Sequence, residues 1–106
     1  MLTKEQILSS QDRPTKEVEV SEWGGSVLVA SMSGADRDRF ELSMKDEELH
    51  NIRARLVALT VVDESGDRIF TDKDITALGK KSAAALDKVF SAARELNGFG
   101  DDIEKN

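Results

Sequence analysis

Apolar and polar residues alternate in the N-terminal part of the chain, a pattern that predicts a β-hairpin. The alternation runs from Lys16 to Ser21, so this strand should keep one face in water. From Ser26 to Met32 the residues are apolar on both faces, and this second strand should lie deeper. The sequence between the strands, Glu-Trp-Gly-Gly at 22–25, predicts a tight loop because glycine tolerates positive φ.

Helical spacing begins after the predicted hairpin. Ser33 is a suitable N-cap for a helix over residues 34–44. A second helix is predicted over residues 46–62, because leucine and isoleucine recur there at intervals of three and four. These positions form the most clearly amphipathic stripe in the chain: Leu49, Ile52, Leu56 and Leu59.

The C-terminal half adds shorter elements and one long helix. Residues 63–67 form a polar turn, residues 68–70 suit a short extended piece, and Thr71 should cap a short helix. A final helix is predicted over residues 81–97, with Gly98 ending it. Its apolar face contains Leu86, Val89, Phe90, Ala93 and Leu96.

The two ends of the chain have weaker patterns. Thr3 and Gln6 have capping-box spacing ahead of a short, frayed helix, so residues 1–15 should be loosely attached. Acidic residues follow the last predicted helix, and residues 99–106 should form a flexible acidic tail. We therefore expect a single globular domain over residues 1–98.

Together these elements predict an α+β fold that is mostly α. The N-terminal β-hairpin should pack on a small helical bundle, because the helical stripes are too wide to remain in water. Leu56 and Phe90 are predicted core residues. A length of 106 residues suits one domain of this kind.

Composition narrows the classes of function. The chain has 15 Lys and Arg against 21 Asp and Glu, a net charge of −6, so we expect no binding to nucleic acid or to a membrane surface. No apolar run approaches the roughly 20 residues of a membrane span, and residues 1–10 lack the apolar centre of an export signal. The absence of cysteine excludes disulfides and thiolate chemistry and suits a reducing cytosol.

Catalytic chemistry finds little support in the sequence. His50 is the only histidine, and its predicted helix places charged residues around it, as on a solvated face. No nucleophile elbow, P-loop or dinucleotide fingerprint is present. We predict no catalytic residue, no cofactor and no enzymatic activity.

Residues 63–74 resemble a calcium-binding loop in their spacing of oxygen-bearing side chains. The sixth position of such a loop requires glycine for its sharp turn, but here it is Arg68. Asp74 is also shorter than the usual bidentate glutamate. A polar turn followed by a capped helix explains the same residues, so we predict no metal site.

Three residues are candidates for partner binding. Trp23 lies at the hairpin tip, where it could be an exposed anchor for a partner or a lid folded on the apolar face of the hairpin. We favour the lid. Phe99 and Ile103 could form a docking peptide, but a frayed end is the alternative we favour for them. An alanine-rich face at residues 83–85 and 92–93 permits close approach of another helix, from this chain or from a second subunit of a homo-oligomer.

Several stretches resemble, in their order and spacing, the tail assembly chaperones of long-tailed, lambda-like bacteriophages (siphoviruses) and prophages. The resemblance covers nearly the whole chain and rests on no single stretch. The stretches are EVEV at 17–20, EWGGSV at 22–27, residues 31–40, NIRARLVA at 51–58 and KSAAALD at 81–87.

This resemblance implies a non-enzymatic role in virion morphogenesis. Such proteins bind the tape measure protein in the host cytoplasm, keep it soluble, help to recruit tail tube subunits and leave the finished tail. Many members also occur in a longer form made by ribosomal frameshifting. A competing class is a structural component of the tail or head-to-tail joint that stays in the virion. The resemblance supplies no residue-level motif, so Trp23, Phe99 and Ile103 rest on physical reasoning alone.

Overall fold

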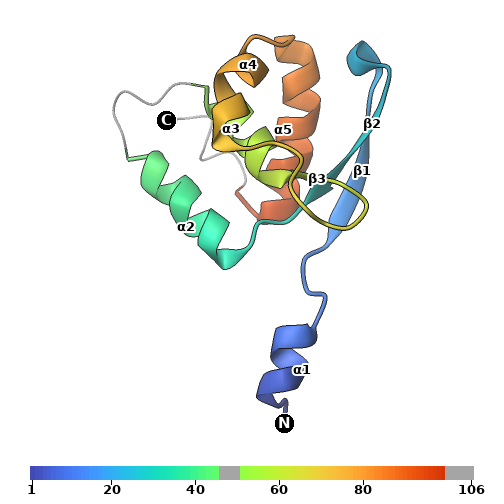
Figure 1. Ribbon diagram of the computed structural model, residues 1–106. Coiled ribbons are helices and arrows are strands. Elements are labelled where there is room, and N and C mark those ends of the chain that lie inside the picture. Colours follow the sequence, from blue (N-terminus) through green and yellow to red (C-terminus); the bar gives the residue numbers. More distant parts are fainter. Residues whose placement is uncertain (46–50, 100–106) are drawn as a thin grey trace.

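A small antiparallel sheet and a group of helices make up the body of the molecule (Figure 1). The computed structural model describes residues 1–45 and 51–99. The strands are β1 (Thr15–Val20), β2 (Gly25–Ala30) and β3 (Val61–Val62), in the order β1-β2-β3. The helices are α1 (Lys4–Ser9), α2 (Gly34–Ser43), α3 (Ile52–Thr60), α4 (Ile75–Gly79) and α5 (Ala83–Asn97), with 3-10 turns η1 (Ser21–Trp23) and η2 (Asp72–Asp74). The predicted α+β, mostly α class is confirmed.

The hairpin of β1 and β2 forms within one or two residues of the predicted boundaries. Val18 lies opposite Val27, and both side chains contact the core on the inner face of the sheet. Val20 and Val29 are completely buried on that face. The loop becomes η1 followed by Gly24, whose φ of 78° lies in the left-handed region that favours glycine.

The helix predicted over residues 46–62 is wrong at its C-terminal end. The helix α3 ends at Thr60, and Val61 and Val62 become β3, paired with Val29 and Leu28. β2 has an edge that β1 leaves unpaired, and the β-branched valines at 61 and 62 suit an extended strand that pairs with this edge. The N-terminal part of the prediction, with Leu49 and His50, lies outside the described residues.

The helix α3 is also less amphipathic than its spacing suggests. From Ala54 onward nearly every residue is buried, including the residues between the predicted stripe positions. Apart from Arg53 and Arg55 near its start, the helix is therefore covered on most sides, as expected of a helix in the centre of a domain. The polar member of this run, Thr60, donates its hydroxyl hydrogen to the carbonyl of Leu56 at 2.7 Å. The buried residues of α3 are Ala54, Leu56, Val57, Ala58, Leu59 and Thr60.

The long helix α5 completes the core by packing against α3, β1 and β2. Ser82 caps its first turn by accepting a hydrogen bond from the Ala85 amide, and Gly98 ends it at φ 72°. Leu56 is 0% exposed and Phe90 3%, which confirms both predicted core positions. Ala85 and Ala93 are fully buried, so at least part of the alanine-rich face serves packing within this chain.

Residues at the N-terminus project from this body. The capping box between Thr3 and Gln6 is present, and every residue of α1 is exposed. Figure 1 shows α1 standing away from the sheet and from the other helices. Within the described residues, no helix is both long and apolar enough to cross a membrane.

Candidate partner-binding surfaces

The hairpin tip is tied to α5 by an ion pair. The Lys88 ammonium lies 2.7 Å from the Glu22 carboxylate, and this hydrogen bond lowers the pKa of Glu22 below its ordinary value. The next residue, Trp23, is half-buried and packs against the core. Trp23 therefore lies where a lid on the apolar face would lie, with part of its ring in solvent.

Phe99 packs on the body instead of extending into solvent as the tail prediction implied. Its ring centroid lies 5.4 Å from that of Phe40, and the Arg37 guanidinium carbon lies 3.9 Å from the Phe99 centroid. The Phe99 amide donates to the carbonyl of Arg94 at 3.0 Å. These contacts join the end of α5 to α2. Ile103, the third candidate, lies outside the described residues.

Asn97 connects three segments beside Phe99. Its side-chain oxygen accepts a hydrogen bond from the Met32 amide at 2.7 Å, and its carbonyl accepts one from Arg37 at 2.9 Å. Its side-chain nitrogen donates to the Ala93 carbonyl at 2.8 Å. No sequence pattern indicated this role, because an asparagine before glycine at a helix end is ordinary in any sequence.

The structure does not bring Trp23 and Phe99 together. The hairpin tip contacts α5 near Lys88, whereas Phe99 follows the C-terminal end of that helix. At about 1.5 Å per helical residue, Lys88 and Asn97, the last residue of α5, lie roughly 14 Å apart along the helix. A short partner helix could contact one of these residues or the other, and only a longer one could contact both.

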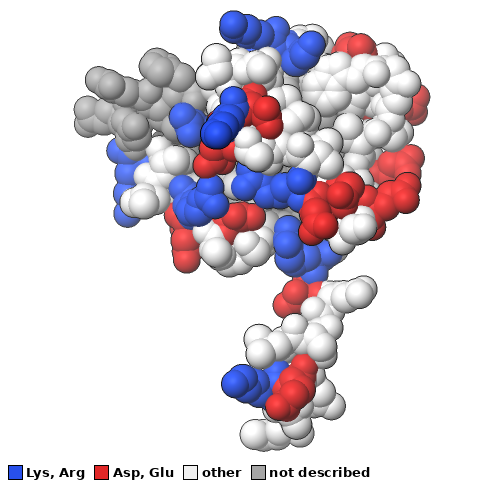
Figure 2. All heavy atoms as spheres, in the orientation of Figure 1, with Lys and Arg blue, Asp and Glu red and all other residues white. Residues whose placement is uncertain are grey.

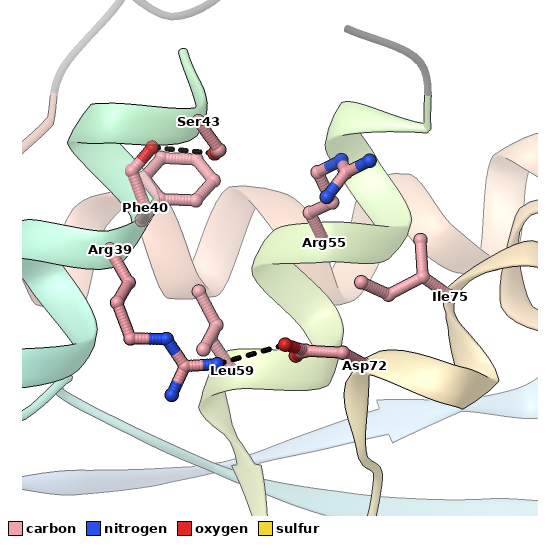
Figure 3. A pocket seen from close by; sticks show the side chains of 7 residues that line it. All are labelled: Arg39, Phe40, Ser43, Arg55, Leu59, Asp72 and Ile75. Carbon is pink, nitrogen blue, oxygen red and sulfur yellow. Dashed lines mark hydrogen bonds and ion pairs between the residues drawn. The ribbon is translucent and has the colours of Figure 1, made fainter.

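A shallow pocket lies between α2, α3 and the η2–α4 segment (Figure 3). Arg39 crosses it to Asp72, with 2.9 Å between the guanidinium nitrogen and the carboxylate oxygen. The pocket has a volume of about 100 Å³, well below the roughly 300–1,000 Å³ of small-molecule sites. It can therefore admit a single side chain of a partner. Its lining consists of Arg39, Phe40, Ser43, Arg55, Leu59, Asp72 and Ile75.

This pocket was not predicted from the sequence. Phe40 and Leu59 come from different helices, and Asp72 lies 33 positions after Arg39. Only the packing of α2 on α3 places a charged rim around these apolar side chains. The sequence pattern places Phe40 on the core-facing side of α2 and so predicts that its side chain is buried. It does not show whether that side chain lines a pocket or lies in the closed core.

The residues of the calcium-like spacing have other partners. The Asp63 carboxylate accepts hydrogen bonds from the amides of Ser65 and Asp67, at 2.9 and 3.0 Å, and so shapes its own turn. The Arg68 guanidinium donates to the carbonyl of Ala58 at 2.9 Å, in the last turn of α3. Within residues 1–45 and 51–99, no three His, Cys, Asp or Glu side chains are grouped so that they could hold a metal ion.

Comparisons with known proteins agree over most of the chain. A family model described as "Phage tail assembly chaperone" matches residues 3–106. Among solved structures, the tail assembly chaperone of bacteriophage HK97 superposes with a TM-score of 0.64 at 19% sequence identity, covering 87% of this chain and 90% of that chain. Similarity at this identity establishes a shared fold. No curated protein matches the sequence.

Proposed function

The chain belongs to the phage tail assembly chaperone family, and on this basis we propose that it binds the tape measure protein during tail assembly. In this proposal it keeps the tape measure protein soluble in the host cytoplasm, helps to recruit tail tube subunits and catalyses no reaction. The observation that carries the proposal is the family match over residues 3–106.

The charge of the chain suits this role. A tape measure protein is long and helical, and its apolar stripes favour self-association. A small partner with a net charge of −6 would cover such stripes and add negative charge, so that neighbouring complexes repel one another.

We assign the contact to the pocket between α2 and α3. Phe40, Leu59 and Ile75 line this pocket but are only 1%, 7% and 9% exposed, so a side chain of a tape measure helix would chiefly meet the rim, where Arg39 and Asp72 carry charges of both signs. The side chains of Trp23 and Phe99 pack against other residues of this chain. Their part in binding, like that of Ile103, stays a prediction.

Co-expression with the tape measure protein of the same phage tests the proposal. We expect an affinity-tagged chain to recover a complex and to raise the soluble yield of the tape measure protein. Arg39→Glu, at the pocket rim, should weaken the complex by about fivefold or more, the equivalent of about 1 kcal/mol. Arg53→Glu is the matched control, because Arg53 is a similarly exposed arginine paired with an aspartate on another face.

A complex that does not form, or a soluble yield that does not rise, would count against the chaperone role. The alternative, a structural component of the tail or head-to-tail joint, would then be favoured. Mass spectrometry of purified particles would test it directly. A retained tail or joint component would be present in fixed copy number, whereas a chaperone should be absent.

A further inference from the structure

The strand β1 lies at the edge of the sheet, and the two edges of this sheet differ in how they are covered. At the β3 edge, Val62 forms a bridge with Arg68, and the Ile69 amide donates to the Val61 carbonyl at 3.3 Å. Within residues 1–45 and 51–99, no strand or bridge pairs with β1 on the side away from β2. Among the described residues, the chain thus covers one edge of its sheet and leaves the other open.

The register of the hairpin shows which backbone groups face this open side. The Ser31 amide donates to the carbonyl of Pro14 at 3.0 Å, and from this pair hydrogen-bonded and non-hydrogen-bonded pairs alternate along the hairpin. The amides and carbonyls of the even-numbered residues of β1 therefore point toward β2, and those of the odd-numbered residues, Thr15, Glu17 and Glu19, point outward. We call this row of outward-facing backbone groups the β1 edge. It contains no bulge and no proline, two features that keep other strands from pairing with an edge.

A groove of about 340 Å³ runs between the β1 edge and α5. At one end the Lys16 ammonium lies 3.9 Å from the Glu95 carboxylate, and at the other end lies Lys88, already paired at the hairpin tip. Val18, from the inner face of β1, and Ala92, from α5, line the groove together with these charged residues. An added strand would therefore find both backbone partners and room for an inward-facing side chain.

Glu17 and Glu19 determine which strand suits this edge. Their side chains lie on the outer face of the sheet, opposite the uncharged Leu28 and Ser26 of β2. Among the described residues neither carboxylate forms an ion pair, whereas each lysine of the groove is paired with another glutamate. Figure 2 shows acidic side chains gathered on the right of the body, where the hairpin lies, and basic side chains mostly to their left.

Cross-strand pairs of opposite charge stabilise a sheet, and like charges directly opposite each other destabilise it. A strand with lysine or arginine on its outer face therefore matches Glu17 and Glu19. The β1 strand of a second copy does not match, because antiparallel pairing of two β1 edges sets glutamate against glutamate. The charge pattern thus selects a basic partner over another copy of this chain.

We propose that the β1 edge accepts a fourth strand from a partner protein, and that basic and apolar residues alternate in this strand. Its basic residues lie opposite Glu17 and Glu19 on the outer face. The apolar residue between them lies opposite Val18 and enters the groove beside Ala92. Main-chain hydrogen bonds supply affinity, and the alternating side chains supply specificity. The α2–α3 pocket shares no residue with this edge and its groove, so the strand does not compete for the proposed tape measure contact.

A synthetic peptide tests the proposal with the full chain. The probe has the six-residue length of β1 and alternates lysine with valine. In amide hydrogen exchange followed by NMR, Lys16 and Val18 should exchange slowly in the free chain, because their amides bond to β2. Exchange at Glu17 and Glu19 should slow by about tenfold or more only when the peptide is bound. A control peptide with the same residues in two blocks has the same charge and should leave both amides nearly unchanged.

Substitutions at residue 17 separate the charge from the backbone. Glu17→Gln removes the carboxylate and should raise the Kd of the alternating peptide by about threefold. Glu17→Pro also removes an outward-facing amide that makes no bond to β2, so the hairpin should be retained and Kd should rise by about tenfold or more. Glu64→Gln, at an exposed position in the turn at 63–67, is the control for the loss of one charge.

A probe peptide N-methylated on all its backbone amides gives the same comparison without changing the protein. It keeps the charge and the alternation but cannot donate to the β1 edge, so it should not slow exchange at Glu17 and Glu19. Binding of the unmethylated peptide without slower exchange at these two amides would overturn the proposal, and so would equal affinity for the alternating and block peptides. Amides at 17 and 19 that exchange slowly in the free chain at high concentration would place a second copy on the edge instead. No tape measure protein takes part, so failure of strand addition is distinguishable from failure of the proposed function.

Discussion

Leu56 lies at the centre of the core, on a helix that is buried almost all round. It is 0% exposed, and its neighbours cannot collapse fully into the space that a smaller side chain would leave. We expect Leu56→Ala to lower the free energy of unfolding by about 2–5 kcal/mol in urea melts. Leu42→Ala, at a position 68% exposed, should change it little. A loss below about 1 kcal/mol at Leu56 would contradict the observed packing.

The ion pair between Glu22 and Lys88 predicts a pH dependence of stability. The ammonium of Lys88 lowers the pKa of Glu22 from its ordinary value of 4.5, so the folded state binds this proton less tightly than the unfolded chain does. The pair therefore stabilises the fold above the ordinary pKa, and this contribution is lost as the pH falls through the lowered, folded value.

Glu22→Gln should consequently lower Tm at about pH 7 in low salt, and the difference from the unmodified chain should vanish as the pH falls through the lowered pKa of Glu22. Glu19→Gln, at an exposed position of β1, is the matched control and should show no such convergence. A Glu22→Gln difference that grows on acidification would mean that the folded state raises the pKa of Glu22 instead of lowering it.

Individual residues differed in how far their roles could be predicted. Leu56 and Phe90 were predictable because apolar spacing reports burial directly. Asn97 and Arg39 were not, because their partners Met32 and Asp72 lie far away in sequence and meet them only through tertiary packing. Long-range polar contacts of this kind produce no periodic pattern of residues in a single sequence.

Among the elements, the hairpin contacts the body at its tip through Trp23 and through Lys88, which pairs with Glu22 and donates to the Ser21 hydroxyl. Trp23 packs against the core, so Trp23→Ala should lower stability by about 2 kcal/mol, less than the roughly 3–5 kcal/mol for a fully buried aromatic. Calorimetry should show a lower Tm, and binding to the tape measure protein should weaken only in proportion to unfolding. An unchanged Tm with binding weakened by more than about 1 kcal/mol would instead make Trp23 an exposed anchor.

Element boundaries were predicted well where local chemistry marks them. Ser33 and Gly98 each occupy the cap position predicted for them, whereas α5 begins at Ala83, two residues later than predicted, with Ser82 as its cap. The boundary between α3 and β3 was missed because Val61 and Val62 fit the helical apolar pattern as well as a strand. These two valines form a strand because they pair with β2. That pairing is a long-range contact, which the local sequence pattern does not report.

In the molecule as a whole, the three surfaces lie on different parts of the chain. The α2–α3 pocket, the hairpin tip and the β1 edge with its groove share no residue. A partner could therefore engage one of these surfaces without covering the others.

The position of α5 at the end of the described chain also determines when the domain can fold during its synthesis. The hairpin and α3 emerge first from the ribosome, but their apolar faces meet α5 only when residues 83–97 have been made. The hydrogen bond from the Met32 amide to Asn97 closes across 65 positions. Such long-range closure slows folding because much chain entropy is lost before contacts repay it. A nascent chain of this protein therefore keeps these apolar faces uncovered until residues 83–97 have been synthesised.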